Sequence, residues 1–157
     1  MRDRFPLQPI GQAADGGAGQ RGARHRRADP GRGYLGARLD YVQALCDADD
    51  RYVWLSQYTN PGNWQAHYPT TAPAIAREFP HLDVLFVGAG TMGTLTGCAR
   101  YFRERDRPDR IVAVDSVGSV TFGGSPGRRM IPGPGASVRP PLLDETLVDS
   151  ARWCITA

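Results

Sequence analysis

One short motif could do chemistry. Gly88-Ala89-Gly90-Thr91-Met92-Gly93 fits the pattern G-x-G-x-x-G, and Asp115 follows 22 residues after its last glycine. In a dinucleotide site this spacing places an acidic residue on the ribose hydroxyls. The physics holds for any phosphate, because glycines let the backbone approach and free N–H groups at a helix start face the anion. A turn needed only for packing remains the alternative.

The neighbours of the glycines favour a terminal phosphate. Thr91 and Thr94 add hydroxyl donors, which suit a phosphate monoester better than a bridging pyrophosphate. A second polar loop, Gln57–Asn63, lies about 25 residues upstream and has no role in a dinucleotide site. The dinucleotide motif also usually opens its domain, whereas here it lies in the middle of the chain.

The elements around the motif predict an α/β fold with a parallel sheet. Asp83–Val87 reads as a strand buried on both faces, Thr94–Arg105 as a helix, and Ile111–Val114 as a second buried strand. Leu95, Cys98, Ala99 and Phe102 should form the inner face of that helix. Strand, turn, helix and strand make a βαβ unit.

Other elements are expected on both sides of this unit. We expect helices over residues 34–48 and 71–79, the second with Ile75 and Phe79 inward, and a short buried strand over Tyr52–Leu55. Residues 115–141 read as loop, 141–148 could start a helix, and 150–157 should form no completed element. Because one βαβ unit cannot cover both faces of its sheet, residues 34–149 should be part of a larger domain.

Composition limits the chemistry. All 19 basic residues are Arg, so the 157 residues offer no lysine amine for a Schiff base. Seven Arg and three Asp fall within residues 1–33, which predicts a disordered or non-native basic tail. No aromatic side chain alternates with these arginines, so nucleic-acid binding is not expected.

The apolar runs and the cysteines of the chain give an expectation for its cellular location. No apolar run approaches 18 residues, and the N-terminus has no apolar signal core, so neither a membrane span nor secretion is expected. Cys46, Cys98 and Cys154 are far apart and have no disulfide or metal-ligand spacing, which fits a reducing cytoplasm.

Several segments together carry a family resemblance. In chain order they are Gln57–Asn63 (QYTNPGN), Ala66–Tyr68 (AHY), Thr70-Thr71, Gly88–Gly97 (GAGTMGTLTG) and Ile111–Asp115 (IVAVD). The combination resembles the cysteine synthase and cystathionine β-synthase family of fold-type II pyridoxal-phosphate enzymes. It covers roughly residues 29–149, a third to a half of a family catalytic unit. The tail and the last eight residues do not match, as a truncated or frameshifted reading frame would explain.

Further segments resemble one branch of that family. These are Val114–Ser119 (VDSVGS), Phe122–Gly124 (FGG) and Ile131–Gly135 (IPGPG). They are most similar to the N-(2-amino-2-carboxyethyl)-L-glutamate synthases of 2,3-diaminopropionate and siderophore biosynthesis. The resemblance implies a homodimeric enzyme that replaces the β-substituent of an activated serine with a nucleophile. In this branch O-phospho-L-serine and L-glutamate would react; in cysteine synthases the pair is O-acetylserine and sulfide.

The resemblance also implies site residues. The phosphate of pyridoxal 5'-phosphate would lie on Gly90, Thr91, Met92, Gly93 and Thr94, although the family commonly has Gly where Met92 stands. Gln57 would contact the substrate carboxylate, and Tyr58, where many relatives have Phe, could orient a polar second substrate. His67 should brace its turn, Asn60 and Asn63 should shape theirs, and Arg128, Arg129 and Arg139 should belong to a solvated loop.

Three family features are missing. The Schiff-base lysine, the Ser/Thr-Gly-Asn substrate loop and the downstream Ser or Thr for the pyridine nitrogen have no counterpart in these 157 residues. The residues present should therefore be inactive alone. An NAD-linked dehydrogenase, with Asp115 on the ribose, and a non-catalytic degenerate remnant are the alternatives.

Overall fold

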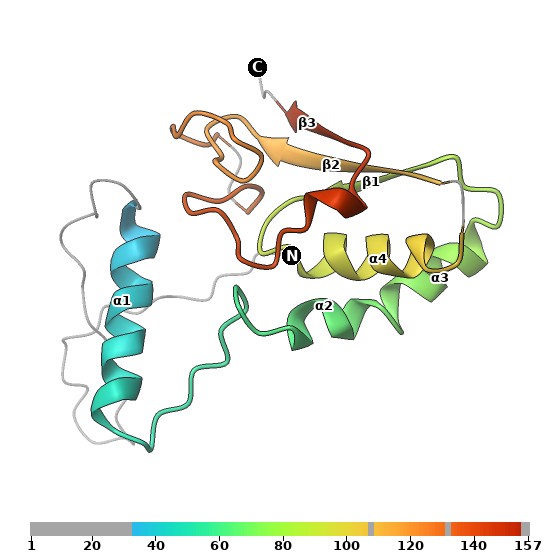
Figure 1. Ribbon diagram of the computed structural model, residues 1–157. Coiled ribbons are helices and arrows are strands. Elements are labelled where there is room, and N and C mark those ends of the chain that lie inside the picture. The colour runs from blue at the N-terminus through green and yellow to red at the C-terminus, as the bar shows by residue number, and fades with distance from the viewer. Residues whose placement is uncertain (1–32, 107–108, 131–132, 155–157) are drawn as a thin grey trace, which may run out of the picture.

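The computed structural model describes residues 33–106, 109–130 and 133–154 (Figure 1). The elements in chain order are α1 (Gly33–Ala48), α2 (Gly62–His67), α3 (Thr71–Glu78), β1 (Val84–Gly88), α4 (Gly93–Arg103), β2 (Arg110–Ser116), the 3-10 turn η1 (Glu145–Leu147) and β3 (Ser150–Cys154). The expected tail, residues 1–33, lies outside this range except for Gly33, the first residue of α1.

The predicted βαβ unit is confirmed. Strands β1 and β2 run parallel, with Val84 opposite Arg110 and Gly88 opposite Val114, and α4 connects them. Leu95, Cys98, Ala99 and Phe102 are all at most 2% exposed, as the apolar face of α4 predicts. They pack on Val87, Ile111 and Ala113 in one core. Burial raises the pKa of the Cys98 thiol to about 11, so Cys98 serves as a neutral core residue.

The end of the chain differs from its prediction. Residues 150–154 form β3, which pairs in parallel with the free side of β2 from Val112–Ser150 to Ser116–Cys154. The preceding residue fixes the register: the amide of Asp149 donates to the Ile111 carbonyl at 2.9 Å. Its carboxylate accepts from the Ile111 amide at 2.6 Å and from Arg103 at 2.5 Å. The strand was missed because this segment is short and polar, and its pairing partner is distant in sequence.

The Asp149 anchor makes the fold sensitive to acid. The Ile111 amide, and secondarily Arg103, hold the pKa of Asp149 below its usual 3.8. A depressed pKa contributes stability that is present above the unfolded value and lost as pH falls through the folded value. We expect Asp149→Asn to lower the melting temperature at pH 6 and to reduce its further fall below about pH 4. Thermal melts between pH 3 and 6 would measure this, and parallel curves for the two proteins would contradict it.

Two other predicted elements and one predicted side-chain position are wrong, whereas the helix predicted over residues 71–79 forms as α3. Tyr52–Leu55 is not a strand: no strand in the described residues pairs with it, and Tyr52, Val53 and Leu55 are 49%, 80% and 78% exposed. Phe79 ends α3 but is 56% exposed rather than inward. Over 141–148 only the turn η1 forms, with Asp144 accepting from the Thr146 amide at 3.1 Å.

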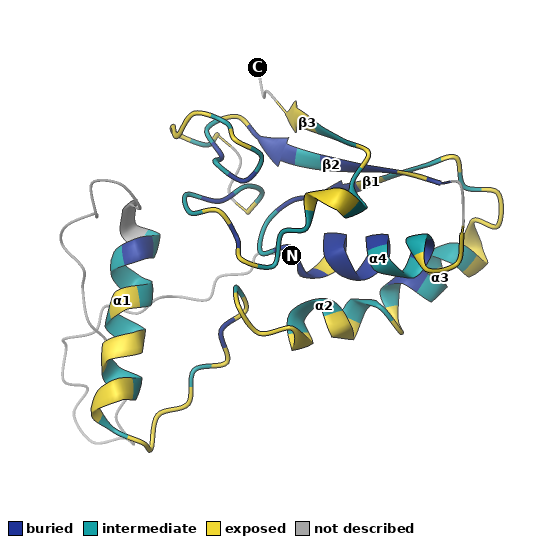
Figure 2. Cartoon of the chain, viewed as in Figure 1, coloured by how far each residue is buried: buried dark blue, intermediate teal, exposed yellow. Residues whose placement is uncertain are grey.

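Helix α1 and the sheet are less buried than predicted. The helix forms where its spacing predicts, but Leu35, Leu39, Val42 and Cys46 are only half-buried, and Figure 1 shows α1 apart from the sheet. Strand β1 is not buried on both faces, since Phe86 is 63% exposed. Helix α4 covers one face of the sheet and α2 and α3 pack on α4, whereas no described helix covers the other face (Figure 2).

Gly97 lets α2 and α4 meet at backbone distance. A Cβ at this position would lie 2.5 Å from the Trp64 carbonyl oxygen and 2.7 Å from His67 Cβ. The Trp64 carbonyl oxygen belongs to the backbone of α2 and cannot rotate away as the end of a side chain could. We therefore expect Gly97→Ala to cost about 1–3 kcal/mol of unfolding free energy, despite the higher helix propensity of Ala. Urea denaturation would measure the loss. An unchanged or raised stability would show that the two helices can separate freely.

Candidate functional site

The glycine turn joins β1 to α4 through a left-handed residue. Met92, the N-cap of α4, has φ 74°, a conformation that favours glycine. Its side chain is only 2% exposed and packs in the core, so burial offsets the backbone strain. The positive φ also gives a physical reason for glycine at this position in the resembled family.

Five successive amides of this turn have no hydrogen-bond acceptor among the described residues. The N–H groups of residues 90–94 donate to no acceptor in the described part of the chain, and the first bond closing the helix runs from the Thr96 amide to the Met92 carbonyl at 2.9 Å. Free amides and the positive end of the α4 dipole favour an anion at this point. These features suit a phosphate, and phosphate binding at the turn stays a prediction.

Asn63 joins the second polar loop to the glycine turn. Its Nδ2 donates to the Gln57 carbonyl at 2.6 Å and to the Thr91 hydroxyl at 3.0 Å, a residue 28 positions away. A Cβ on Gly93 would lie 2.1 Å from Asn63 Oδ1, so the amide side chain lies directly on that glycine. The sequence predicted Asn63 only as a turn residue and missed this bridging role.

His67 and Asn60 support the same corner, as predicted. Nδ1 of His67 lies 2.9 Å from the Thr71 hydroxyl and Nε2 lies 3.2 Å from the Thr94 hydroxyl. Both ring nitrogens therefore hold neighbouring side chains in place, and neither is free to act as an acid or base. Asn60 Oδ1 accepts from the Gly62 amide at 2.8 Å, which closes the turn before α2.

Gln57 and Tyr58 lie in the loop that Asn63 ties to the turn. Gln57 is exposed and Tyr58 is half-buried, and neither side chain makes a hydrogen bond within the described residues. Their proposed roles toward substrates stay predictions.

A third segment borders the turn and was not predicted as part of the site. The amide of Gly135 donates to the Ala89 carbonyl at 2.6 Å, and the Gly133 carbonyl lies 3.9 Å from where a Gly90 Cβ would be. Gly133 has φ 109° and Gly135 has φ 80°, both in the region that favours glycine. The Gly-Pro-Gly run was a sequence signal of a sharp loop, but its place beside Ala89 depends on the tertiary fold.

Asp115 does not suit a dinucleotide. It is 0% exposed, and its Oδ1 accepts from the Ser116 amide at 2.8 Å. A buried carboxylate cannot reach a ribose in solvent, so the dehydrogenase alternative loses the residue on which it depended.

The loop arginines are engaged or peripheral. Arg139 pairs with Glu145 and Arg129 donates to the Ser137 hydroxyl at 3.1 Å, while Arg128 is exposed.

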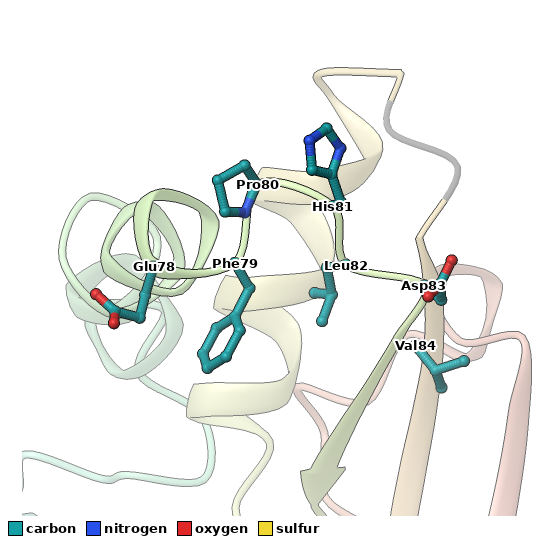
Figure 3. Close-up of a pocket in the computed structure, with 7 residues that line it drawn as sticks. All are labelled: Glu78, Phe79, Pro80, His81, Leu82, Asp83 and Val84. Carbon is teal, nitrogen blue, oxygen red and sulfur yellow. The ribbon is translucent and has the colours of Figure 1, made fainter.

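The hollow of about 520 Å³ in Figure 3 is separate from the glycine turn, because its lining residues, 78–84, lie at the opposite end of β1.

Sequence comparison identifies the family of the chain. The profile of the family described as "Pyridoxal-phosphate dependent enzyme" matches residues 20–152. The chain belongs to this family. It is 42% identical over 124 residues to N-(2-amino-2-carboxyethyl)-L-glutamate synthase of Ralstonia nicotianae, which covers 78% of this chain and 37% of that protein. A protein of the same name from Cupriavidus metallidurans is 40% identical over 118 residues, 74% of this chain and 35% of its own.

A solved structure has a similar fold and supports this family assignment. The O-acetylserine dependent cystathionine beta-synthase from Helicobacter pylori superposes with a TM-score of 0.68 and 31% identity, over 76% of this chain and 40% of that one. The fold is therefore part of the fold-type II pyridoxal-phosphate architecture, and pyridoxal phosphate is the family cofactor. The chain spans little more than a third of the length of the curated relatives it matches.

The residues of the chain fit one end of the family cofactor. The amides without acceptors at the start of α4 suit its phosphate, whereas the 157 residues contain no lysine to bond its aldehyde carbon. No described helix is long and apolar enough to traverse a lipid bilayer.

Asn63 should hold the two loops of this site together. We expect Asn63→Ala to release Gln57 and Thr91 from each other and to weaken pyridoxal-phosphate binding several-fold, while costing about 1 kcal/mol of stability. Fluorescence titration would measure the affinity. Asn60→Ala, which removes a turn bond without touching Thr91, is the matched control, and equal affinities for the two variants would contradict the bridging role.

Proposed function

We propose that the chain is the phosphate-binding part and one substrate wall of a pyridoxal-phosphate dependent β-replacement synthase. Its reaction would join an activated serine, O-phospho-L-serine, to the amine of L-glutamate, with a cysteine-synthase-like pair as the alternative. The relatives named N-(2-amino-2-carboxyethyl)-L-glutamate synthase, at 42% and 40% identity, support this branch. The observation that carries the proposal is the run of amides without acceptors at residues 90–94, which Asn63 ties to the Gln57 loop.

The chain's own residues would bind and orient. The amides of Gly90–Thr94 would hold the cofactor phosphate, with the Thr91 and Thr94 hydroxyls beside them. The Gln57 amide would donate to the substrate carboxylate, and the Tyr58 hydroxyl would orient the second substrate. When bound, the cofactor supplies an electron sink for loss of the β-substituent.

We propose that these 157 residues have no activity alone and that the protein is located in the cytoplasm. The lysine and the family's pyridine-nitrogen partner must come from elsewhere, because the sequence contains no lysine and no matching Ser or Thr segment. The chain would still bind the cofactor phosphate reversibly.

Two measurements on the full chain test this proposal. Incubation with pyridoxal phosphate, O-phospho-L-serine and L-glutamate should give no condensation product by mass spectrometry and no borohydride-reducible visible absorbance. Titration with pyridoxal phosphate should nevertheless show saturable binding that inorganic phosphate displaces. Product formation would refute the inactivity, and absence of any phosphate-displaceable binding would refute the proposed role.

A further inference from the structure

The ring of His67 joins the start of α3 to the start of α4. Its Nδ1 lies 2.9 Å from the Thr71 hydroxyl, and its Nε2 lies 3.2 Å from the Thr94 hydroxyl. Within the described residues the ring has no further hydrogen-bond partner and no ion pair. A neutral imidazole carries one N–H and one bare nitrogen, whereas a hydroxyl can donate or accept. Two arrangements of protons therefore fit these two contacts.

The two arrangements differ in what the Thr94 hydroxyl offers to an anion. With the proton on Nδ1, the ring donates to Thr71, and the Thr94 O–H is used as a donor to Nε2. With the proton on Nε2, the ring donates to Thr94, Thr71 donates to Nδ1, and the Thr94 O–H is left for another acceptor. Each arrangement makes two hydrogen bonds, so these contacts alone select neither.

The Thr94 side chain lies at the end of α4 where an anion would bind. Cα–Cβ bonds in an α-helix tilt toward the N-terminus, so this side chain lies over the turn that precedes it. That turn carries the amides of residues 90–94, which have no acceptor among the described residues. Thr94 is also exposed. An anion on these amides would therefore meet either the proton or the lone pairs of the Thr94 hydroxyl.

The Thr91 hydroxyl already has the arrangement that suits an anion. It accepts from Asn63 Nδ2 at 3.0 Å. The nitrogen of this amide is identified because it also lies 2.6 Å from the Gln57 carbonyl, which can only accept. The Thr91 O–H proton is thus left for another acceptor. A proton on Nε2 of His67 would put the Thr94 hydroxyl in the same state.

We infer that His67 is a positioning residue of the proposed phosphate site, and that a bound phosphate fixes its neutral ring in the form with the proton on Nε2. The Thr94 hydroxyl then donates to the phosphate, and the Thr71 hydroxyl donates to Nδ1. A hydrogen bond to a charged acceptor is stronger than one to a neutral acceptor, so the anion selects this arrangement. The ring keeps one proton throughout. The inference rests on the proposed function, since it requires a phosphate on the amides of residues 90–94.

Nitrogen-15 spectra of the imidazole rings test the inference in the full chain. At about pH 8, above the range in which histidine usually titrates, long-range proton–nitrogen correlations show which ring nitrogen carries the proton. His67→Gln identifies the His67 signals among those of the three histidines. We expect pyridoxal phosphate and inorganic phosphate to raise the fraction of the Nε2–H form until it predominates, and pyridoxal to leave the ring unchanged.

Thr94→Val removes the hydroxyl and nearly keeps the shape of the side chain. We expect this variant to bind pyridoxal phosphate roughly tenfold more weakly, because a hydrogen bond to a charged group is lost, and its His67 ring should not respond to phosphate. Thr70→Val is the matched control. The Thr70 hydroxyl donates to the Ala66 carbonyl at 2.5 Å and not to His67, so both the affinity and the ring response should stay unchanged. Thermal melts would confirm that the two variants fold alike.

The outcomes separate this inference from the proposed function. Saturable, phosphate-displaceable binding that leaves the His67 proton on Nδ1, does not change the ring, or protonates both nitrogens overturns the inference alone. Equal affinities of Thr94→Val and Thr70→Val do the same. Absence of phosphate-displaceable binding overturns both the inference and the proposed function. The ring spectrum of the unmodified chain decides the inference even if a variant fails to fold.

Discussion

Phe102→Ala should remove most of the stability of this chain. Phe102 is 0% exposed on the inner face of α4, in the same buried cluster as Val87, Ile111 and Ala113. Truncating a buried phenylalanine costs about 3–5 kcal/mol, because the lost transfer energy is joined by a cavity that the surroundings fill only partly. That loss approaches roughly 5 kcal/mol, the lower end of the unfolding free energies of natural domains. We expect this chain to lie near that lower end, because no described helix covers one face of its sheet.

Urea denaturation followed by circular dichroism would measure the effect. Phe79→Ala is the control, since a phenylalanine that is 56% exposed should change stability by no more than about 0.5 kcal/mol. Similar losses for the two variants would show that α4 does not organise the core. A broad, non-cooperative transition in the unmodified chain would show that the described residues form no core on their own.

Gly93→Ala should strongly weaken binding of pyridoxal phosphate. The new Cβ would lie 2.1 Å from Asn63 Oδ1 and 2.6 Å from Asn63 Cγ, so either Asn63 or the start of α4 must move. Movement of the helix start redirects the amides of residues 90–94, and movement of Asn63 breaks its bonds to Thr91 and Gln57. We expect at least a roughly tenfold loss of pyridoxal-phosphate affinity, which corresponds to about 1.4 kcal/mol.

Gly88→Ala is the matched control in the same motif. A Cβ on Gly88 meets no atom within 4 Å, and this glycine lies outside the five predicted phosphate-binding residues. Its affinity should stay within about twofold of the unmodified chain. An equal loss in both variants would mean that the effect comes from general destabilisation of the turn, and thermal melts of the two would identify that case.

The sequence predicted the centre of this fold well because local signals coincide there. Leu95, Cys98, Ala99 and Phe102 have helical spacing, the flanking strands are continuous apolar runs, and glycines mark the turn between them. Each element could be identified without knowledge of its partners.

Elements that depend on distant partners were predicted poorly. Tyr52–Leu55 has strand composition, but no described strand pairs with it, whereas β3 is polar and forms because Asp149 fixes it against Ile111. Phe79 and Phe86 have the side chains of core residues, yet nothing described covers them. The bridge from Asn63 to Thr91 crosses 28 residues and has no local signature.

We propose that the amides of residues 90–94 bind the single phosphate of pyridoxal phosphate. Nitrogen-15 amide spectra of the full chain test it directly, titrated in parallel with pyridoxal phosphate, pyridoxal and NADH. We expect saturable shifts of the amides of Gly90, Thr91, Met92, Gly93 and Thr94 with pyridoxal phosphate only. Equal shifts with pyridoxal, stronger ones with NADH, or shifts confined to other residues would contradict the claim.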